Sequence, residues 1–422
     1  MRIAVVGSGI SGQGAALALH GLPDVDVTLF EQDPRAGGHA NTLTLNVAGG
    51  TRAVDTGFIV YNDDNYPNFR RFLDWSGVVT QPSDMSFALS LDEGAYEWAG
   101  CQKRTLSAFF AQRRNAVSIA HWRLLAEIVK FQRVARQAVS SNSVPGETLA
   151  RYLDQAGFSE SLRERYLLPM GAAIWSMTRD EMLEFPAASF LTFFDNHKLL
   201  HWSRPQWRTV TGGSRNYVAR TAEVLRDRLV VNRRIVSIIR DQDCVRLADR
   251  GGAELIFDRA VVATSAPRAL ALLDNPSPRE RDILGAFRVS ANRAVVHTDA
   301  RLMPRSRPAW ASWNVVASSS QRAATVTYWM NRLQNLPPEP DIFVSLNPHV
   351  LPQPGTVLAQ IDYEHPLYDA AAIAAQAGLA SIQGPLVTFA GAWSGYGFHE
   401  DGLRSGLAAA SAFGGIAPWE RT

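Results

Sequence analysis

The sequence predicts an α/β fold, and three observations support this prediction. Residues 3–12 read Ile-Ala-Val-Val-Gly-Ser-Gly-Ile-Ser-Gly, an apolar run that leads into a glycine-rich turn. Glu31 closes a second apolar run nineteen positions after the last of these glycines. Later segments, at 230–239, 258–264 and 386–413, have the composition of strands and helices that return to the same sheet. Strand, glycine turn, helix, strand and acid in this order form a Rossmann-type βαβ unit.

The first strand and turn suit a dinucleotide. The run from Ile3 to Val6 is expected to be buried on both faces. Gly7 allows the tight turn, Gly9 lets the backbone approach a pyrophosphate, and Gly12 lets the next helix pack closely. That helix directs free N–H groups and a partial positive charge at the phosphates. The predicted pyrophosphate contacts are therefore Gly7, Gly9, Ile10, Ser11 and Gly12. Glu31 is placed to accept hydrogen bonds from ribose hydroxyls.

The residues after Glu31 indicate which dinucleotide is bound. Residues 32–42 read Gln-Asp-Pro-Arg-Ala-Gly-Gly-His-Ala-Asn-Thr. This resembles the second signature of glutathione-reductase-type flavoproteins, above all the flavin amine oxidase and phytoene desaturase superfamily. The resemblance implies FAD, with NAD(P) as the alternative. It also implies cofactor contacts from Gly38, His39, Asn41 and Thr42. His39 stands where that superfamily usually has Arg or Lys, and it can also be an ordinary loop histidine.

Composition excludes several classes of protein. The 422 residues are 46% hydrophobic, which suits two globular domains, and a net charge of +2 gives no indication of nucleic acid binding. The two cysteines, Cys101 and Cys244, are far apart, so no disulfide framework and no metal site are expected. Met-Arg-Ile leads directly into the first strand, and no run of 18 apolar residues occurs. We therefore expect a cytoplasmic protein; the sequence gives no oligomeric state.

The most helical stretch, residues 105–139, contains neither Gly nor Pro. One predicted apolar face comprises Val117, His121, Leu124, Leu125, Ile128, Phe131 and Ala135. Six basic residues between 113 and 136 lie mostly elsewhere on the helix. Two interpretations remain open: a cap helix with a solvated basic face, or a peripheral contact with the inner membrane surface through which an acyl chain enters.

Both domains are predicted to be discontinuous. The FAD-binding domain comprises residues 1–90, 206–270 and 380–422, and the substrate or cap domain comprises 91–205 and 271–379. In the superfamily pattern a strand residue offers its backbone to the adenine, and Ile235 matches it. Thr56, Gly57 and Phe58 match the segment beside the isoalloxazine ring.

The C-terminal segment carries the last cofactor motif. A strand ends at Gly391, a glycine-rich loop follows, and a helix is predicted to begin near Asp401–Gly402. The resemblance implies that the amides of Gly402 and Leu403 face the flavin edge. The sequence departs from the superfamily at Ala392, where an acid is usual. This segment has no cysteine, so dissociable FAD is expected, with a histidyl link left open.

The whole chain is also similar to a bacterial subgroup of FAD-dependent oxidoreductases. The motifs are Gly-Gly-His-Ala-Asn-Thr at 37–42, Val-Asp-Thr-Gly-Phe-Ile-Val-Tyr-Asn at 54–62, and Gly-Tyr-Gly-Phe-His-Glu-Asp-Gly-Leu at 395–403. The best-understood type in this subgroup is the desaturase of furan fatty acid biosynthesis. The similarity implies a methyl-branched unsaturated fatty acyl or phospholipid substrate, and a lipid methyltransferase as pathway partner.

The implied catalytic residues are His399, Glu400 and Tyr61, followed by His197 and His365. An apolar tunnel lined by aromatic side chains would hold the acyl chain. Three alternatives stay open on sequence alone. The chain could be an amine or amino-acid oxidase, a non-enzymatic flavin-bound partner of a lipid methyltransferase, or an isomerase without net oxidation.

Overall fold

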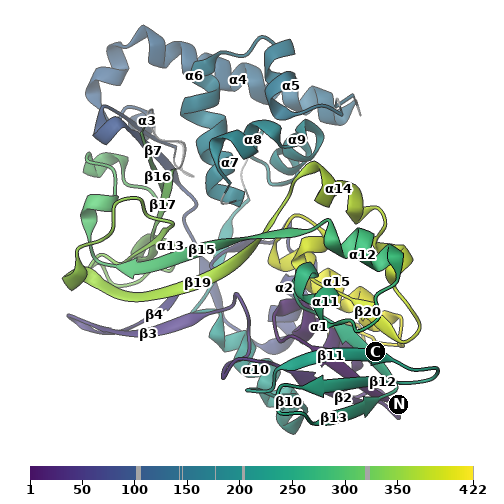
Figure 1. The fold of residues 1–422 in the computed structure, drawn as a ribbon. Helices are drawn as coiled ribbons and strands as arrows, with labels where there is room; N and C mark the ends of the chain where they lie inside the picture. Colours follow the sequence, from purple (N-terminus) through teal and green to yellow (C-terminus); the bar gives the residue numbers. More distant parts are fainter. Residues whose placement is uncertain are drawn as a thin grey trace.

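The computed structural model describes residues 1–100, 106–141, 143–144, 146–175, 177–201, 205–318 and 324–421. Three parts are visible in Figure 1: a Rossmann-type part near both termini, a large sheet, and a helical region on top. Within the described residues, no helix combines the length and the apolar character needed to cross a membrane.

The Rossmann part is a five-stranded parallel sheet. Its order is β10 (Leu229–Val230), β2 (Asp26–Phe30), β1 (Arg2–Val6), β14 (Arg259–Val262) and β20 (Val387–Phe389). Helix α1 (Ile10–Leu19) follows β1 and packs on α15 (His399–Ser411). A Cβ at Gly406 would lie 2.0 Å from the carbonyl oxygen of Ser11, so glycine allows this close approach. The predicted α/β fold class is confirmed.

A three-stranded antiparallel sheet lies beside it. Its strands are β11 (Ile235–Arg240), β12 (Val245–Asp249) and β13 (Glu254–Phe257). The strand predicted over 230–239 is therefore two strands, because β10 ends at Val230 and β11 begins at Ile235. Apolar side chains from both sheets share one core, which includes Phe30, Leu247 and Trp393.

The large sheet has seven strands. Its order is β19 (Val357–Leu367), β15 (Arg288–His297), β18 (Phe343–Leu346), β17 (Thr325–Trp329), β16 (Trp313–Ala317), β7 (Phe87–Leu91) and β8 (Tyr96–Gly100). The long strands β15 and β19 run from this sheet toward the Rossmann part (Figure 1). Two small sheets complete the strands: β3 (Thr42–Val47) with β4 (Gly50–Asp55), and β5 (Tyr61–Asn62) with β9 (Trp207–Val210) and β6 (Thr80–Pro82).

The helical region occupies the chain between β8 and β9. Its helices are α3 (Leu106–Phe109), α4 (Ile119–Ser140), α5 (Leu149–Gln155), α6 (Glu160–Leu162), α7 (Leu168–Trp175), α8 (Arg179–Glu184) and α9 (Ala187–Asn196). The buried face of α4 is formed by His121, Leu124, Ile128, Phe131 and Ala135, as predicted. The prediction is wrong at Val117, which precedes α4 and is 84% exposed.

The remaining helices surround the sheets. They are α2 (Pro67–Ser76), α10 (Arg215–Leu225), α11 (Ala266–Leu272), α12 (Pro278–Gly285), α13 (Met330–Leu333) and α14 (Ala370–Gln376). The strand β7 crosses the predicted domain boundary at residue 90 and pairs with β16. Helices α2 and α15 contact each other, which brings the chain after β5 against the C-terminal helix.

Candidate active site

The turn between β1 and α1 leaves open space at one glycine. A Cβ at Gly9 would have no atom within 4 Å. A Cβ at Gly7 would lie 2.6 Å from a backbone oxygen, and one at Gly38 would lie 3.1 Å from the Cα of Gly9. The first helical hydrogen bond runs from Gln13 N to Gly9 O at 2.9 Å, so the three preceding amides, those of Ile10, Ser11 and Gly12, lack helical acceptors. The turn therefore fits a pyrophosphate in front of Gly9, Ile10, Ser11 and Gly12.

Gly12 has the packing role that the sequence predicted. A Cβ there would lie 1.8 Å from the carbonyl oxygen of Gly7 and 3.4 Å from the Cβ of Ala263. A side chain at position 12 would collide with the turn itself. A side chain at Gly9, and not one at Gly12, would therefore enter the space for a phosphate.

Glu31 is buried and its carboxylate is held in place. Ser8 donates to Glu31 Oε2 through its amide (3.0 Å) and its hydroxyl (2.5 Å), and Asp33 N donates to Oε1 at 3.0 Å. The same Ser8 hydroxyl accepts a hydrogen bond from Gly37 N. Ser8 thus ties the two glycine loops to the acid predicted to bind the ribose.

An open cleft of about 650 Å³ lies beside Glu31. Its lining includes Gln32, Asp33 and the segment 230–234, which immediately precedes the predicted adenine contact. Ile235 itself is buried at the start of β11. The cleft therefore lies next to both predicted contacts for the adenosine half, Glu31 and Ile235.

The second glycine loop touches the first, and His39 follows it. Gly38 has a φ of +58°, a conformation that favours glycine. His39 is exposed, while neighbouring protein atoms still desolvate its imidazole. Desolvation, and then the charge of Arg35, lower the pKa of His39, so its imidazole is neutral.

The segment 56–58 packs on this loop. Phe58 N donates to His39 O at 2.8 Å, and a Cβ at Gly57 would lie 2.3 Å from the same oxygen. The Thr56 amide donates to Asn41 O (2.9 Å), and the Thr56 hydroxyl lies 2.7 Å from the hydroxyl of Tyr363. The predicted contacts Asn41, Thr56, Gly57 and Phe58 therefore converge around His39.

A buried carboxylate that the sequence reasoning missed connects three parts of the fold. Asp55 accepts hydrogen bonds from the Thr42 hydroxyl (2.5 Å), the Ser214 hydroxyl (2.7 Å) and Gln334 Nε2 (2.9 Å). Burial raises the pKa of Asp55 to about 6, against the lowering effect of the Thr42 and Ser214 hydrogen bonds. Thr42 was predicted as a cofactor contact, but its hydroxyl donates to the Asp55 carboxylate. The sequence feature that could have revealed Asp55 is an acid at the end of an apolar strand.

The C-terminal helix begins earlier than predicted. Its first residue is His399, and Gly402 N donates to Phe398 O at 3.0 Å. The amides of Gly402 and Leu403 therefore lie within the hydrogen-bonded part of the helix. The prediction that they are the free donors at the helix start is wrong, because the helix starts three residues earlier. Unpaired amides belong to the first turn, at His399–Asp401. Gly402 and Leu403 pack on α1 instead: a Cβ at Gly14 would lie 2.5 Å from Leu403 Cδ1.

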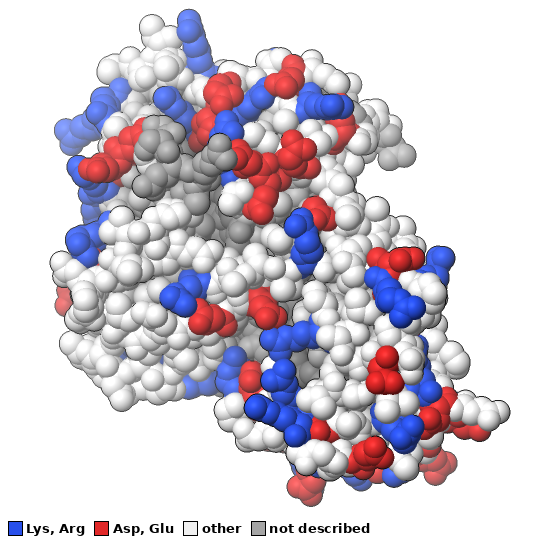
Figure 2. All heavy atoms as spheres, viewed as in Figure 1, with Lys and Arg blue, Asp and Glu red and all other residues white. Residues whose placement is uncertain are grey.

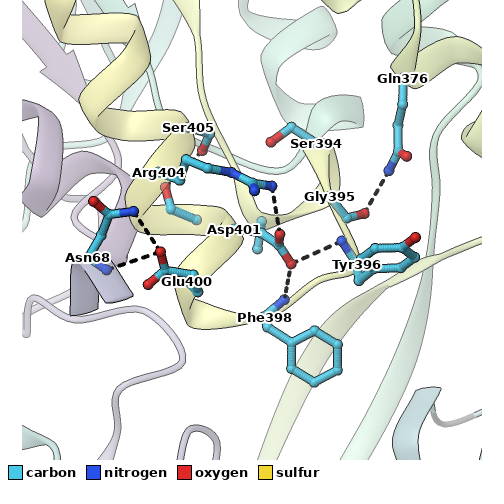
Figure 3. A network of polar contacts seen from close by, with 12 residues as sticks. Asn68, Gln376, Ser394, Gly395, Tyr396, Phe398, Glu400, Asp401, Arg404 and Ser405 are labelled. Atoms are coloured by element: carbon cyan, nitrogen blue, oxygen red, sulfur yellow. Dashed lines mark hydrogen bonds and ion pairs between the residues drawn. The ribbon is translucent and has the colours of Figure 1, made fainter. Parts of the chain in front are cut away.

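Asp401 and Glu400 point to opposite sides of α15 (Figure 3). Asp401 Oδ2 accepts the amides of Tyr396 (3.0 Å) and Phe398 (3.2 Å), and its Oδ1 accepts from Arg404. Glu400 accepts three hydrogen bonds at the start of α2, from Asn68 N, Asn68 Nδ2 and Phe69 N. Because Glu400 satisfies a helix N-terminus, the prediction of a catalytic base there is replaced by a structural role.

The loop before α15 begins at Gly391. Gly391 N donates to Ser405 Oγ at 2.9 Å, and a Cβ at Gly391 would lie 2.0 Å from Trp393 Nε1. Gln376 Nε2 donates to Gly395 O at 2.6 Å (Figure 3). These hydrogen bonds fix the loop that leads to α15.

His399 is packed and not free. Its ring stacks on Phe58 with centroids 3.6 Å apart, and its Nε2 lies 2.7 Å from the Tyr217 hydroxyl. Burial lowers the pKa of His399 well below its ordinary value, so it is neutral. Tyr61 is also buried, and its hydroxyl donates to Thr80 Oγ1 at 3.2 Å. Both candidate catalytic side chains have protein partners.

An aromatic wall joins helix α9 to the loop before α15; we define it as Phe193, His197, Tyr396 and Phe398. Phe193 stacks on His197 (3.8 Å) and on Phe398 (5.2 Å), and it lies 5.7 Å from Tyr396. Burial lowers the pKa of His197 to about 4. His197 Nδ1 lies 3.1 Å from Phe193 O, which can only accept, so Nδ1 carries the proton and Nε2 keeps a lone pair.

The last predicted histidine lies beside the second glycine loop. His365 is 5.5 Å from the ring of His39 and stacks on Tyr363. Burial, and then His39, lower the pKa of His365 to about 3. Tyr363 was one of many aromatic residues in the sequence, and nothing local distinguished it as the partner of Asn41 and Thr56.

Comparison with known proteins gives similarities of fold. Among curated proteins no match is found. Cyclohexylamine oxidase from Brevibacterium oxydans IH-35A has a similar structure, with a TM-score of 0.67 at 16% identity over 97% of this chain and 98% of that one. A fatty acid isomerase from P. acnes that produces CLA gives 0.68 at 14% identity over 98% of each chain. A putative protoporphyrinogen oxidase from Exiguobacterium sp. 255-15 gives 0.67 at 17% identity over 98% of each chain.

These likenesses establish the fold, and a family model establishes the family. The model described as flavin containing amine oxidoreductase matches residues 10–332. The match begins inside the first glycine loop and covers the segment 56–58 and most of the large sheet. The chain belongs to the flavin containing amine oxidoreductase family, and it is an oxidoreductase whose cofactor is FAD.

Proposed function

We propose that this enzyme desaturates a methyl-branched unsaturated fatty acyl chain, held as a free acid or in a phospholipid. The observation that supports this proposal is the aromatic wall, which joins α9 to the loop before α15. Tyr396 and Phe398 are half-buried and offer apolar ring surface, Phe193 is buried behind them, and the half-buried imidazole of His197 beside them is neutral. An alkyl chain gains free energy when it is buried against such a surface.

The fold similarity to a fatty acid isomerase is compatible with this substrate class, since that protein handles a fatty acid on the same fold. The amine oxidases of the same fold support the rival proposal of an amine substrate. The aromatic wall itself fits either substrate class, because ring faces bury an alkyl chain and also attract an ammonium cation. The flavin-reduction experiment below separates the two proposals.

The reaction removes a hydride equivalent and a proton from two carbons and leaves a conjugated diene. Bound FAD supplies the acceptor for the hydride equivalent. The methyl branch stabilises positive charge that develops at the allylic carbon. Apolar side chains exclude water from this carbon and hold the chain extended. We assign the proton to Nε2 of His197, whose lone pair is free because Nδ1–H is bound to Phe193 O.

The test is reduction of the bound flavin without oxygen. The holoenzyme is mixed with a phospholipid that carries a methyl-branched unsaturated chain, with the corresponding free acid, with cyclohexylamine and with putrescine. A saturated straight-chain phospholipid serves as the matched control. The proposal predicts rapid loss of flavin absorbance with the branched-chain phospholipid or free acid, and none with the amines or the saturated control. Reduction by an amine, with none by either acyl substrate, would overturn it.

A further inference from the structure

The outer end of helix α4 exposes apolar side chains in an unusual group, which we call the α4 tip and define as Val117, Ile119 and Trp122. These residues are 84%, 70% and 51% exposed, and they lie within six positions of the chain. Trp122 is held rigidly, because its Nε1 donates to Ala116 O at 2.9 Å and its ring lies 5.1 Å from Phe110. The tip is a preformed apolar projection and not a mobile side chain.

Basic residues continue the same face of the helix. At 3.6 residues per turn, Ile119 and Trp122 share a face with the exposed Arg123, Lys130 and Arg133. The buried face, with Leu124, Ile128 and Phe131, lies opposite and packs on the helical core. Figure 1 places α4 at the edge of the molecule away from the Rossmann part, and Figure 2 shows basic side chains along that outer edge.

The charge of this segment is almost entirely of one sign. Residues 113–140 contain six Lys and Arg and one acid, Glu127. Glu127 is turned to the side, where it accepts hydrogen bonds from the amide and hydroxyl of Ser159. The outward face of α4 therefore presents positive charge around apolar side chains.

We propose that α4 docks this enzyme on the surface of an anionic phospholipid bilayer, with the helix in the plane of the interface. Trp, Ile and Val inserted at the headgroup level, with Arg and Lys beside them, match the chemistry of such a surface. A protein partner would need a complementary groove for three side chains that project this far, whereas a fluid bilayer adapts to them. The inference is independent of the proposed acyl substrate, because it concerns binding and not turnover.

The experiment is flotation of the FAD-loaded enzyme with vesicles of saturated acyl chains, which cannot be desaturated. One set contains phosphatidylcholine alone, and the other contains phosphatidylcholine and phosphatidylglycerol in a two-to-one ratio. We expect binding to the anionic vesicles only. Ile119→Ser with Trp122→Ser should lower binding by at least about tenfold, and Arg123→Gln and Arg133→Gln by about fivefold each.

Matched variants keep the test decisive. Val350→Ser with Leu351→Ser removes two apolar side chains that are 64% and 69% exposed elsewhere on the surface, and it should leave binding unchanged. Val117→Ser tests the tip without touching the Trp122 contacts, and flavin content checks folding. Equal binding by wild type and all variants would overturn the proposal, and so would absence of vesicle binding. Concentration-dependent self-association without vesicle binding would assign the tip to a protein interface and overturn it too.

Discussion

His399 stacks on Phe58 with ring centroids 3.6 Å apart and planes inclined by 12°. The two residues are 341 positions apart, and each belongs to a segment expected beside the flavin ring. Tyr217 from α10 completes the contact through its hydroxyl. The pair thus locks the start of α15 against the segment 56–58.

The open space at Gly9 gives a direct test of the cofactor site. Gly9→Val should abolish FAD binding while the protein still folds, because its backbone angles (φ −62°, ψ 177°) suit valine and its Cβ meets no protein atom. Gly12→Val should instead disrupt folding, since its Cβ would lie 1.8 Å from Gly7 O. Flavin absorbance per protein and far-ultraviolet circular dichroism measure the two effects. Gly355→Val, also in open space, is the control and should keep its flavin.

Glu400 is expected to act on stability and not on chemistry. Glu400→Ala leaves the amides of Asn68 and Phe69 without their acceptor, so the free energy of unfolding should fall by about 1–3 kcal/mol. The rate of flavin reduction per bound flavin should remain within about threefold of wild type. Glu420→Gln removes an exposed acid that pairs with Arg71 on the same helix, and it should change stability by less than about 1 kcal/mol. A large loss of rate at Glu400→Ala would restore the catalytic role.

Asp55 should give stability a pH dependence of unusual sign. Its pKa rises from 3.8 to about 6 in the folded protein, so the folded state binds this proton more strongly than the unfolded state. The stabilisation is complete below the unfolded pKa and is lost as pH rises through about 6. As pH rises from about 5 to about 7.5, ionisation of Asp55 should lower the free energy of unfolding by about 1.4 kcal/mol.

Buried histidines with lowered pKa values act in the opposite sense, so the measurement is a difference between wild type and Asp55→Asn. Urea unfolding of both proteins at about pH 5 and about pH 7.5 gives this difference in the free energy of unfolding. The variant should gain about 1.4 kcal/mol relative to wild type as pH rises across this window. Identical pH profiles for the two proteins would contradict the buried, protonatable Asp55.

His197 is expected to limit the proton step. His197→Phe keeps the aromatic wall but removes Nε2, so diene formation should slow by about 100-fold. Because burial lowers the pKa of His197 to about 4, the wild-type rate should be flat above about pH 5 and should decline as pH falls toward 4. His201→Gln changes a neighbouring histidine that is bound to Asp195, and it should keep the wild-type rate. A wild-type rate that rises between pH 6 and 7 would indicate another base.

Local pattern predicted the elements that depend on local chemistry. The turn at Gly7–Gly12, the acid at Glu31 and the buried face of α4 follow from glycine conformations and helical spacing alone. Val117 was assigned to that face because the periodicity continues through it. The chain changes to a 3-10 helix over Arg113–Val117, and Ser118 caps α4 after it.

Long-range pairing was beyond the sequence. Glu400 looked like a base because it stands in the flavin-edge motif, but its partner Asn68 is 332 positions away. The α15 helix starts before Asp401, whose carboxylate accepts hydrogen bonds from the amides of Tyr396 and Phe398. From sequence spacing alone, such a carboxylate cannot be told from an ordinary N-cap. Asp55 joins Ser214 and Gln334 from segments that only the folded chain brings together.

The central claim is that this flavoenzyme takes electrons from an alkyl chain, and the mass of the product tests it most directly. The holoenzyme is mixed, without oxygen, with an excess of the methyl-branched unsaturated phospholipid, and the lipid is analysed by mass spectrometry after the flavin absorbance stops changing. The account predicts one product molecule per flavin reduced, lighter than the substrate by two hydrogen atoms. A product of unchanged mass, or an unaltered lipid beside fully oxidised flavin, would contradict it.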